Sequence, residues 1–472
     1  MESIQSRNQY LLKNTIVFAI GNLGSKVINF FLVPLYTNVL STKEYGVVDF
    51  IYTIGMLGVP VITLNISEAI MRFCLDKDAD KNKIMSIGLS ILAAATLIGI
   101  ILLPISSLYD KTVSHLNFVI LYIITYAYSQ VFLYYLRGRE LLLQYSFGNI
   151  LYTFSIAIFN IVFLVFLQKG IEGYLEAYIL ANIITAIYGF FAGNILDVLR
   201  NFNFDKSICF SMTKFSAVLI PNSFMWWIMN SSDRIMVTAM AGAAANGIYA
   251  VAYKVPTFLS TFTTIFNTAW SYSAIKENES SDKEEYSNSI YSRMFAITVV
   301  TSSGLIMIMK PFLRIYVESS YYTAWQYTPF LVTGFVFMTL GTFIATSYTV
   351  YKDSKGYLFS GMAGAITNII LNFLLIPIIG TLGAAIATCI SYIVVYMYRA
   401  KDTKKYLKLA IFKKKHVMGL VLLFASTITT FLDNAFGQVL LTIEFFFTLM
   451  LFKDFWREIL KGIIYKIQTL RK

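Results

Sequence analysis

Long apolar stretches separated by short polar segments run through the whole chain. Each is about 17 to 25 residues long, enough for a helix to cross roughly 30 Å of hydrocarbon. Only 14% of the residues are charged, whereas a soluble protein carries about 25%. These stretches cannot all be buried in one water-soluble core, so we expect an all-α polytopic membrane protein with about fourteen transmembrane helices. The expected spans are 14–40, 46–71, 84–108, 115–136, 146–168, 174–196, 214–240, 247–273, 294–313, 324–350, 357–379, 382–398, 417–432 and 435–452.

The N-terminus has none of the features of a cleavable signal peptide. Residues 1–13 are polar, and the apolar run 14–40 is longer than a signal h-region and lacks a small-residue cleavage site. We therefore expect it to be retained as the first span. The three cysteines, Cys74, Cys209 and Cys389, lie far apart without metal-ligand spacing, so we interpret them as packing residues.

The distribution of basic residues predicts the orientation. The formal net charge is +12, and most of the 38 Lys and Arg residues lie in alternate loops, beginning with the N-terminus. The opposite loops contain five: Lys43, Lys111, Lys169, Lys310 and Arg314. The positive-inside rule therefore predicts a multi-pass membrane protein with both termini in the cytoplasm. The excess charge then serves topology and contact with anionic membrane lipids, and nucleic acid is not an expected partner.

Paired glycines suggest an internal repeat. Gly46 follows the first span and Gly247 follows the seventh, while Gly173 precedes the sixth and Gly383 lies at the start of the twelfth. Glycine suits a tight turn or a close backbone approach. Six spans per half give a parallel repeat, so we expect two six-helix lobes related by a pseudo-two-fold axis around a central cavity, plus two C-terminal helices. The expected parts are an N-lobe (1–200), a cytoplasmic linker (201–213), a C-lobe (214–400), and a basic loop with the last two spans and a cytoplasmic tail (401–472).

Ionisable residues within spans are costly and are functional candidates. Lys26, Arg234 and Lys254 lie in the first two helices of each predicted lobe, where they would give the cavity a cationic interior. Such an interior suits a pyrophosphate, because Arg binds phosphate oxygens in a bidentate manner and Lys adds a point charge. Asp49 and Asp233 are candidates for coupling to a proton or sodium ion. The alternative is that these groups pair within the protein or extend to the membrane surface.

Further polar and aromatic residues have a structural interpretation as well. Glu68 and Arg72 are four residues apart at the inner end of a span and are expected to form a structural ion pair. Trp226 and Trp227 lie mid-span, where they could stack on sugar rings or simply pack. The sequence contains no catalytic set, nucleotide loop or metal-ligand spacing, so we expect neither an enzyme nor a cofactor or metal site. Transport would then depend on an H⁺, Na⁺ or substrate gradient.

Several segments together resemble a known family. They are 14–26, 33–41, 44–46 and 69–73 in the first half, and 232–235, 247–249, 252–254 and 383–388 in the second. They are similar to bacterial polysaccharide flippases, the Wzx-type oligosaccharide repeat-unit exporters of the MOP/MATE-like superfamily. The resemblance covers residues from about 10 to 400 and implies two six-helix bundles around a cavity.

The resemblance also implies a function and partners. It implies flipping of undecaprenyl-pyrophosphate-linked oligosaccharide repeat units for O-antigen, capsule or exopolysaccharide synthesis, together with a polysaccharide polymerase and other assembly proteins. Its cationic cavity residues correspond here to Lys26, Arg234 and Lys254. Related flippases for lipid II or teichoic-type precursors also have fourteen spans and remain open. A MATE-like drug or cation antiporter would need an acidic cavity. A membrane-embedded enzyme would need a catalytic set, and a non-transporting scaffold remains a further alternative.

Overall fold

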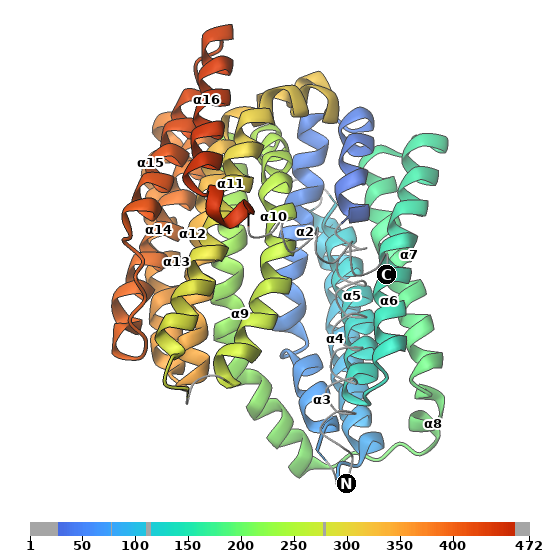
Figure 1. The fold of residues 1–472 in the computed structure, drawn as a ribbon. Helices are drawn as coiled ribbons and strands as arrows, with labels where there is room; N and C mark the ends of the chain where they lie inside the picture. The colour runs from blue at the N-terminus through green and yellow to red at the C-terminus, as the bar shows by residue number, and fades with distance from the viewer. Residues whose placement is uncertain (1–26, 77, 110–114, 277–279, 458–472) are drawn as a thin grey trace, which may run out of the picture. The chain divides into compact units, whose positions relative to one another are not determined.

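A computed structural model describes residues 27–76, 78–109, 115–276 and 280–457 (Figure 1). The described residues are helical apart from short connections, and none of them forms a strand. Contacts within the chain divide it into two compact units, Met1–Gly247 and Ile248–Lys472. The division falls within one long helix, α10, whose first residues belong to the first unit.

The first unit contains the helix Val27–Val39 and the helices up to the start of α10. Their bounds are α2 (Thr42–Ile62), α3 (Ile66–Cys74), α4 (Lys81–Tyr109), α5 (Leu116–Gly138), α6 (Leu142–Asn160) with the π-helical turn η1 (Ile161–Phe166), α7 (Gly170–Ala192), α8 (Ile195–Arg200) and α9 (Lys206–Ala241). Helix α5 packs against α2, α3, α4 and α7, so it is central to this unit.

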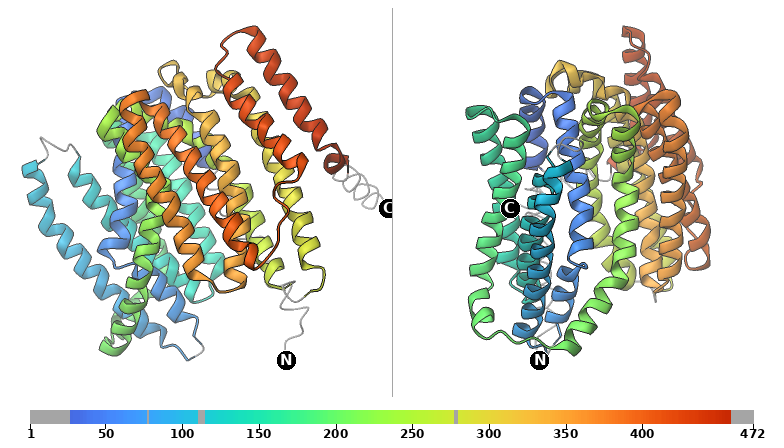
Figure 2. Two further views of the ribbon diagram at one scale, coloured as in Figure 1. Left: turned by 90° about the vertical axis from the view of Figure 1, so that its left-hand side faces the viewer. Right: turned by 180° about the vertical axis from the view of Figure 1, so that it is seen from behind.

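The second unit begins within α10 (Ala243–Lys276). Its other elements are α11 (Lys283–Tyr316), the 3₁₀ segment η3 (Ser319–Gln326), α12 (Thr328–Val350), α13 (Ser354–Ile379), α14 (Thr381–Asp402), the short turn η4 (Thr403–Lys405), α15 (Lys414–Thr429) and α16 (Ala435–Leu451). The most deeply buried of the candidate spans is α12, which packs on α11, α13, α14 and α15. Helices α15 and α16, orange-red to red, run side by side (Figure 2).

Local sequence explains where α2 begins and ends. Ser41 caps its N-terminus: the hydroxyl accepts a hydrogen bond from the Glu44 amide, and the Glu44 carboxylate accepts one from the Ser41 amide. Pro60 lies near its C-terminus, and Leu64 and Asn65 then adopt left-handed backbone angles before α3 starts. The predicted span 46–71 is therefore two helices with a break between them.

The helices agree with the expected membrane class. Nine helices of the described part are long and apolar enough to cross a membrane, and Val27–Val39 and Ala435–Leu451 are shorter apolar helices. The predicted all-α, multi-pass membrane class is thus confirmed, while the count of fourteen stays a prediction. Helix α9 begins at Lys206, so the segment predicted as a linker contains its first turns. The assignment of lobes also stays a prediction.

Candidate functional site: a buried ion pair between α2 and α9

A buried ion pair joins α2 to α9 in the first unit. The guanidinium Nη1 of Arg234 lies 2.9 Å from Oδ1 of Asp49, and these side chains are 13% and 6% exposed. The two residues are 185 positions apart in the chain. Removing two charges from water is costly unless they compensate each other and are also hydrogen-bonded. The pair therefore brings together one predicted phosphate ligand and one predicted ion-coupling residue.

Neighbouring polar groups complete the environment of this pair. The amide Nδ2 of Asn246, at the start of α10, donates to the Gly46 carbonyl at 3.0 Å and to Oδ2 of Asp49 at 3.4 Å. Both carboxylate oxygens of Asp49 therefore accept hydrogen bonds. Asp233 is also buried, and its Oδ1 accepts a hydrogen bond from the Arg234 amide at 2.9 Å. In this network the Asp49 carboxylate pairs with the Arg234 guanidinium, and the Asp233 carboxylate bonds to the Arg234 backbone amide.

The glycines of the predicted repeat make a reciprocal contact beside this network. A Cβ on Gly46 would lie 1.7 Å from the carbonyl oxygen of Ala243, and one on Gly247 would lie 2.0 Å from that of Thr42. Each glycine thus faces the carbonyl oxygen of the residue four positions before the other glycine. Neither has a positive φ, so close helix approach explains the glycines here. Reciprocal contacts between matching residues are expected where two repeated elements meet at a two-fold axis.

Trp227 also links α9 to α2. Its indole Nε1 donates to the carbonyl of Thr53 at 3.0 Å, and its ring packs beside Phe224. The side chain of Trp226 lies outside the described residues. Trp227 is thus held by a backbone acceptor one turn along α2 from Asp49, a contact that suits a packing residue. A role in binding sugar rings stays a prediction.

The remaining predicted residues lie elsewhere. Lys26 is outside the described residues, and Lys254 is a half-buried residue of α10 in the second unit. The expected pair of Glu68 and Arg72 is not formed among the described residues: Arg72 pairs with Asp76 at 2.6 Å instead. Both spacings are four residues along one helix, so the spacing rule could not choose between them. Glu68 lies against the hydroxyl of Tyr134, on α5.

A cluster of tyrosines in the first unit was missed by sequence reasoning. Rings 4.9 to 6.4 Å apart, measured between centroids, connect α2, α5, α7 and the helix before α2. The cluster comprises Tyr36, Tyr45, Tyr52, Tyr122, Tyr126, Tyr174 and Tyr178. The only signal in the sequence was the count of 32 tyrosines. Such rings offer both packing surface and hydroxyl groups near Asp49.

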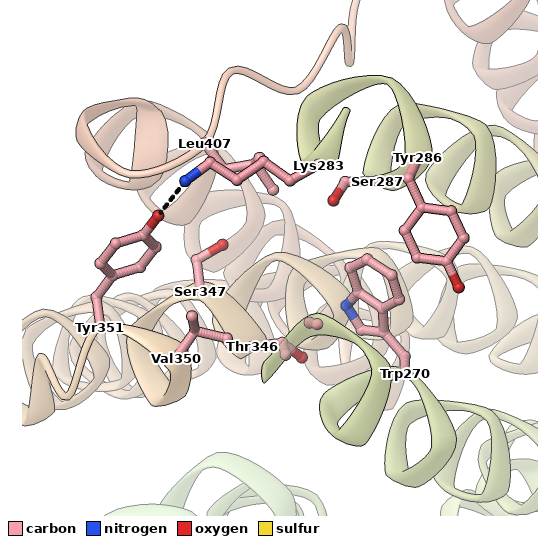
Figure 3. Close-up of a pocket in the computed structure, with 10 residues that line it drawn as sticks. Trp270, Lys283, Tyr286, Ser287, Thr346, Ser347, Val350, Tyr351 and Leu407 are labelled. Carbon is pink, nitrogen blue, oxygen red and sulfur yellow. Dashed lines mark hydrogen bonds between the residues drawn. The ribbon is translucent and has the colours of Figure 1, made fainter. Parts of the chain in front are cut away.

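A small pocket of the second unit has too little room for a lipid-linked substrate. It lies between α10, α11 and α12, where Trp270, Ser347 and Tyr351 line it and the Lys283 ammonium donates to the Tyr351 hydroxyl (Figure 3). Its volume of about 30 Å³ has room for little more than a water molecule. Among the described residues, no three His, Cys, Asp or Glu side chains are grouped as metal ligands would be.

Comparisons with known proteins agree with the fold. The protein is similar to a Lsg locus protein of Haemophilus influenzae, with 22% identity over 57% of this chain and 68% of the relative. It is 25% identical to the lipid II flippase MurJ of Thermosipho africanus over 36% of this chain and 37% of that one. Among solved structures, lipid II flippase MurJ in an inward closed conformation has a TM-score of 0.66 at 16% identity, covering 94% of this chain and all of that one.

A second solved structure shows the same fold. An inward-facing multidrug resistance MATE family transporter of the MOP superfamily has a TM-score of 0.65 at 12% identity, covering 87% of this chain and 95% of that one. The predicted MATE-like fold is therefore confirmed. Residues 11–272 match the family described as polysaccharide biosynthesis protein. This match covers more than half of the chain, and the protein therefore belongs to the polysaccharide biosynthesis protein family.

Proposed function

We propose that the protein flips undecaprenyl-pyrophosphate-linked oligosaccharide repeat units from the inner to the outer leaflet of the bacterial cytoplasmic membrane. The family and the flippase and MATE relatives support a transporter of this kind. The observation that carries the proposal is the buried Asp49–Arg234 pair beside the reciprocal glycine contact. A flippase must close one end of its pathway while the other is open, and this end of α2 is closed tightly against α9 and the start of α10.

In the proposed cycle, Arg234 exchanges partners. Without substrate, its guanidinium is neutralised by Asp49 at 2.9 Å. A pyrophosphate offers the same oxygen geometry with more negative charge, so it can compete with the carboxylate for the guanidinium. Release of Asp49 would then weaken the contact between α2 and α9 and favour opening of this end. Lys26 and Lys254 are proposed as further phosphate ligands, and Asp49 or Asp233 as the group that takes up a coupling ion.

Accumulation of lipid-linked oligosaccharide tests this function. In a strain lacking the gene, the substrate should accumulate on the inner leaflet, and mass analysis of the trapped lipid would identify its sugars. The wild-type protein should clear it, and Arg234→Ala at equal membrane abundance should not. If deletion leaves the leaflet distribution unchanged, the flippase proposal is incorrect. Full complementation by Lys26→Ala, Arg234→Ala and Lys254→Ala would refute their role as phosphate ligands.

A lipid II flippase is the second candidate, because the match to MurJ extends over 178 residues. The two candidates differ in the lipid that accumulates: a peptidoglycan precursor for lipid II, and an oligosaccharide repeat unit for the first proposal.

Reporter fusions to the loops would test the proposed orientation, with both termini in the cytoplasm. Association with a polysaccharide polymerase is proposed as well, and co-purification of the two proteins from membranes would test it.

A further inference from the structure

A basic pocket lies at one end of the second unit, between α11 and the two C-terminal helices α15 and α16. Its volume is about 520 Å³, and it is bordered by α11, by the segment leading into α15 and by the end of α16. Its cationic residues are Arg293, Lys413, Lys414 and Lys415, and Asp454 is its acidic one. Four positive charges against one carboxylate leave the lining strongly cationic. We name this site the α15 basic pocket.

Within the described ranges, few groups neutralise these lysines. Lys415 pairs with Asp454 at 3.0 Å, with both side chains more than half exposed, and such an exposed pair contributes little. The Lys413 ammonium donates to the Ser292 hydroxyl at 3.4 Å, which supplies no charge. Lys414 is exposed to solvent beside them. The pocket therefore has a surplus of positive charge for a ligand to balance.

The backbone at this point adds to the positive potential. Helix α15 begins at Lys414, its N-cap is Lys413, no side chain caps it, and its first turn contains no acidic residue. A helix N-terminus carries a partial positive charge and unpaired amide donors, so acidic residues are favoured there and lysines are not. Consecutive lysines at this place are destabilising unless an anion lies near them. Amide groups and ammonium groups together suit a phosphate.

Apolar surface adjoins the cationic residues. Phe452 and Phe455 belong to the lining, and Val417 and Val421, in the first turns of α15, are 44% and 61% exposed. The predicted span 417–432 begins beside the pocket, and the predicted span 435–452 ends beside it. The pocket is therefore predicted to lie at the depth of the lipid headgroups. A phosphate bound here would have acyl chains beside exposed apolar side chains. This arrangement favours a lipid over a free phosphate ion.

We propose that the α15 basic pocket binds the phosphate headgroup of an anionic phospholipid of the inner leaflet. The positive-inside rule predicts that this end of the helices faces the cytoplasm, where anionic lipids attract clustered lysines. None of the proposed substrate ligands Lys26, Arg234 and Lys254 is among its lining residues. Its occupancy would fix α15 and α16 against α11.

Binding of phosphatidylglycerol to the purified full-length protein tests the proposal. The protein is placed in nanodiscs of phosphatidylcholine with increasing phosphatidylglycerol, and bound lipid is counted by native mass spectrometry. The test variant is Lys413→Gln/Lys414→Gln/Lys415→Gln. The matched control, Lys401→Gln/Lys404→Gln/Lys408→Gln, removes three exposed charges from the same predicted face outside the pocket. We expect binding about 100-fold weaker in the test variant, because each surface cation contributes roughly a fivefold factor.

Three results would overturn the proposal. The first is phosphatidylglycerol binding by the test variant as strong as that of the wild type. The second is a loss of binding in the control variant as large as that in the test variant. The third is binding of inorganic phosphate, without phosphatidylglycerol, as strong as binding of the lipid. The last would assign the site to free phosphate. If the triple variant does not fold, the single variants Lys414→Gln and Arg293→Gln replace it, and each should weaken binding several-fold. This measurement requires no transport, so its failure and failure of the proposed flippase function are distinguishable.

Discussion

Neutralising Asp49 should destabilise the protein strongly, and neutralising Arg234 as well should restore most of the loss. Asp49→Asn keeps the shape of the side chain but leaves the guanidinium of Arg234, only 13% exposed, without its carboxylate. Two charges about 4 Å apart attract by about 4 kcal/mol at an effective dielectric constant of ~20. Removing one partner of a buried pair costs about 3–5 kcal/mol, because the remaining charge is uncompensated. The double variant Asp49→Asn/Arg234→Gln removes both charges of the pair, while the carboxylate of Asp233 is the same in every variant.

Thermal unfolding in one detergent would measure these differences as a double-mutant cycle. We expect a coupling free energy of about 2–4 kcal/mol, since the neutral double variant avoids most of the desolvation cost. Asp76→Asn is the control, because it breaks the Arg72–Asp76 pair, whose side chains are 55% and 56% exposed. An exposed pair of this kind contributes about 0–1 kcal/mol. The reasoning is refuted if the free-energy losses of the two single variants add up to the loss of the double variant. Additive losses would mean that the two charges do not stabilise each other.

The same variants separate stability from transport. If Arg234 holds the pyrophosphate, the double variant folds well but fails to clear inner-leaflet substrate. If Arg234 only pairs with Asp49, the double variant transports at a rate close to that of the wild type. Membrane abundance is measured in parallel, so that loss of protein is not mistaken for loss of transport.

Three further predictions concern other contacts. Gly247→Val places a Cβ 2.0 Å from a carbonyl oxygen of α2, so we expect a loss of about 1–3 kcal/mol or more in unfolding experiments, and an unchanged melting temperature would contradict the close approach. The pKa of Asp353 is lowered mainly by the hydrogen bond from the Gly356 amide. The ionised carboxylate therefore stabilises the folded protein above its unfolded pKa near 4. This stabilisation is lost as the pH falls through the lower pKa of the folded protein. Asp353→Asn should therefore lower the melting temperature at pH 7 and flatten its dependence between about pH 5 and 3, whereas an unchanged pH profile would show that Asp353 does not contribute. Trp227→Phe removes the hydrogen bond to the Thr53 carbonyl and should cost about 1 kcal/mol; a large loss of transport at normal stability would instead indicate contact with substrate.

Hydropathy predicted the helices well because lipid imposes one simple rule on long segments: each must be apolar and satisfy its own backbone hydrogen bonds. Hydropathy is a weaker guide to the helices whose polar side chains form the candidate site. Helices α9 and α10 are 36 and 34 residues long, yet neither is among the nine candidate spans of the described residues. Their polar content, including Asp233 and Arg234, lowers the hydropathy.

The partners of the polar residues could not be predicted in the same way. Sequence position predicted that Asp49 and Arg234 lie within membrane spans, but it did not predict their contact. That contact depends on how α2 and α9 pack, and the two residues are 185 positions apart in the chain. The four-residue rule likewise named Glu68 for Arg72, although Asp76 was equally well spaced and is the observed partner. Local rules specify which contacts are possible, and tertiary packing selects among them.

The glycine contact and the ion pair together limit how this end of the first unit can open. Gly46 and Gly247 bring the backbones of α2 and α10 so close that a single methyl group would not fit between them. A contact packed this closely resists small displacements, so opening has to separate the two backbones. A buried Asp49–Arg234 pair behaves similarly, because moving the charges apart without a new partner leaves both uncompensated. Opening is therefore unfavourable until another anion can hold Arg234, and a phosphate-bearing lipid would supply one at the moment when transport requires it.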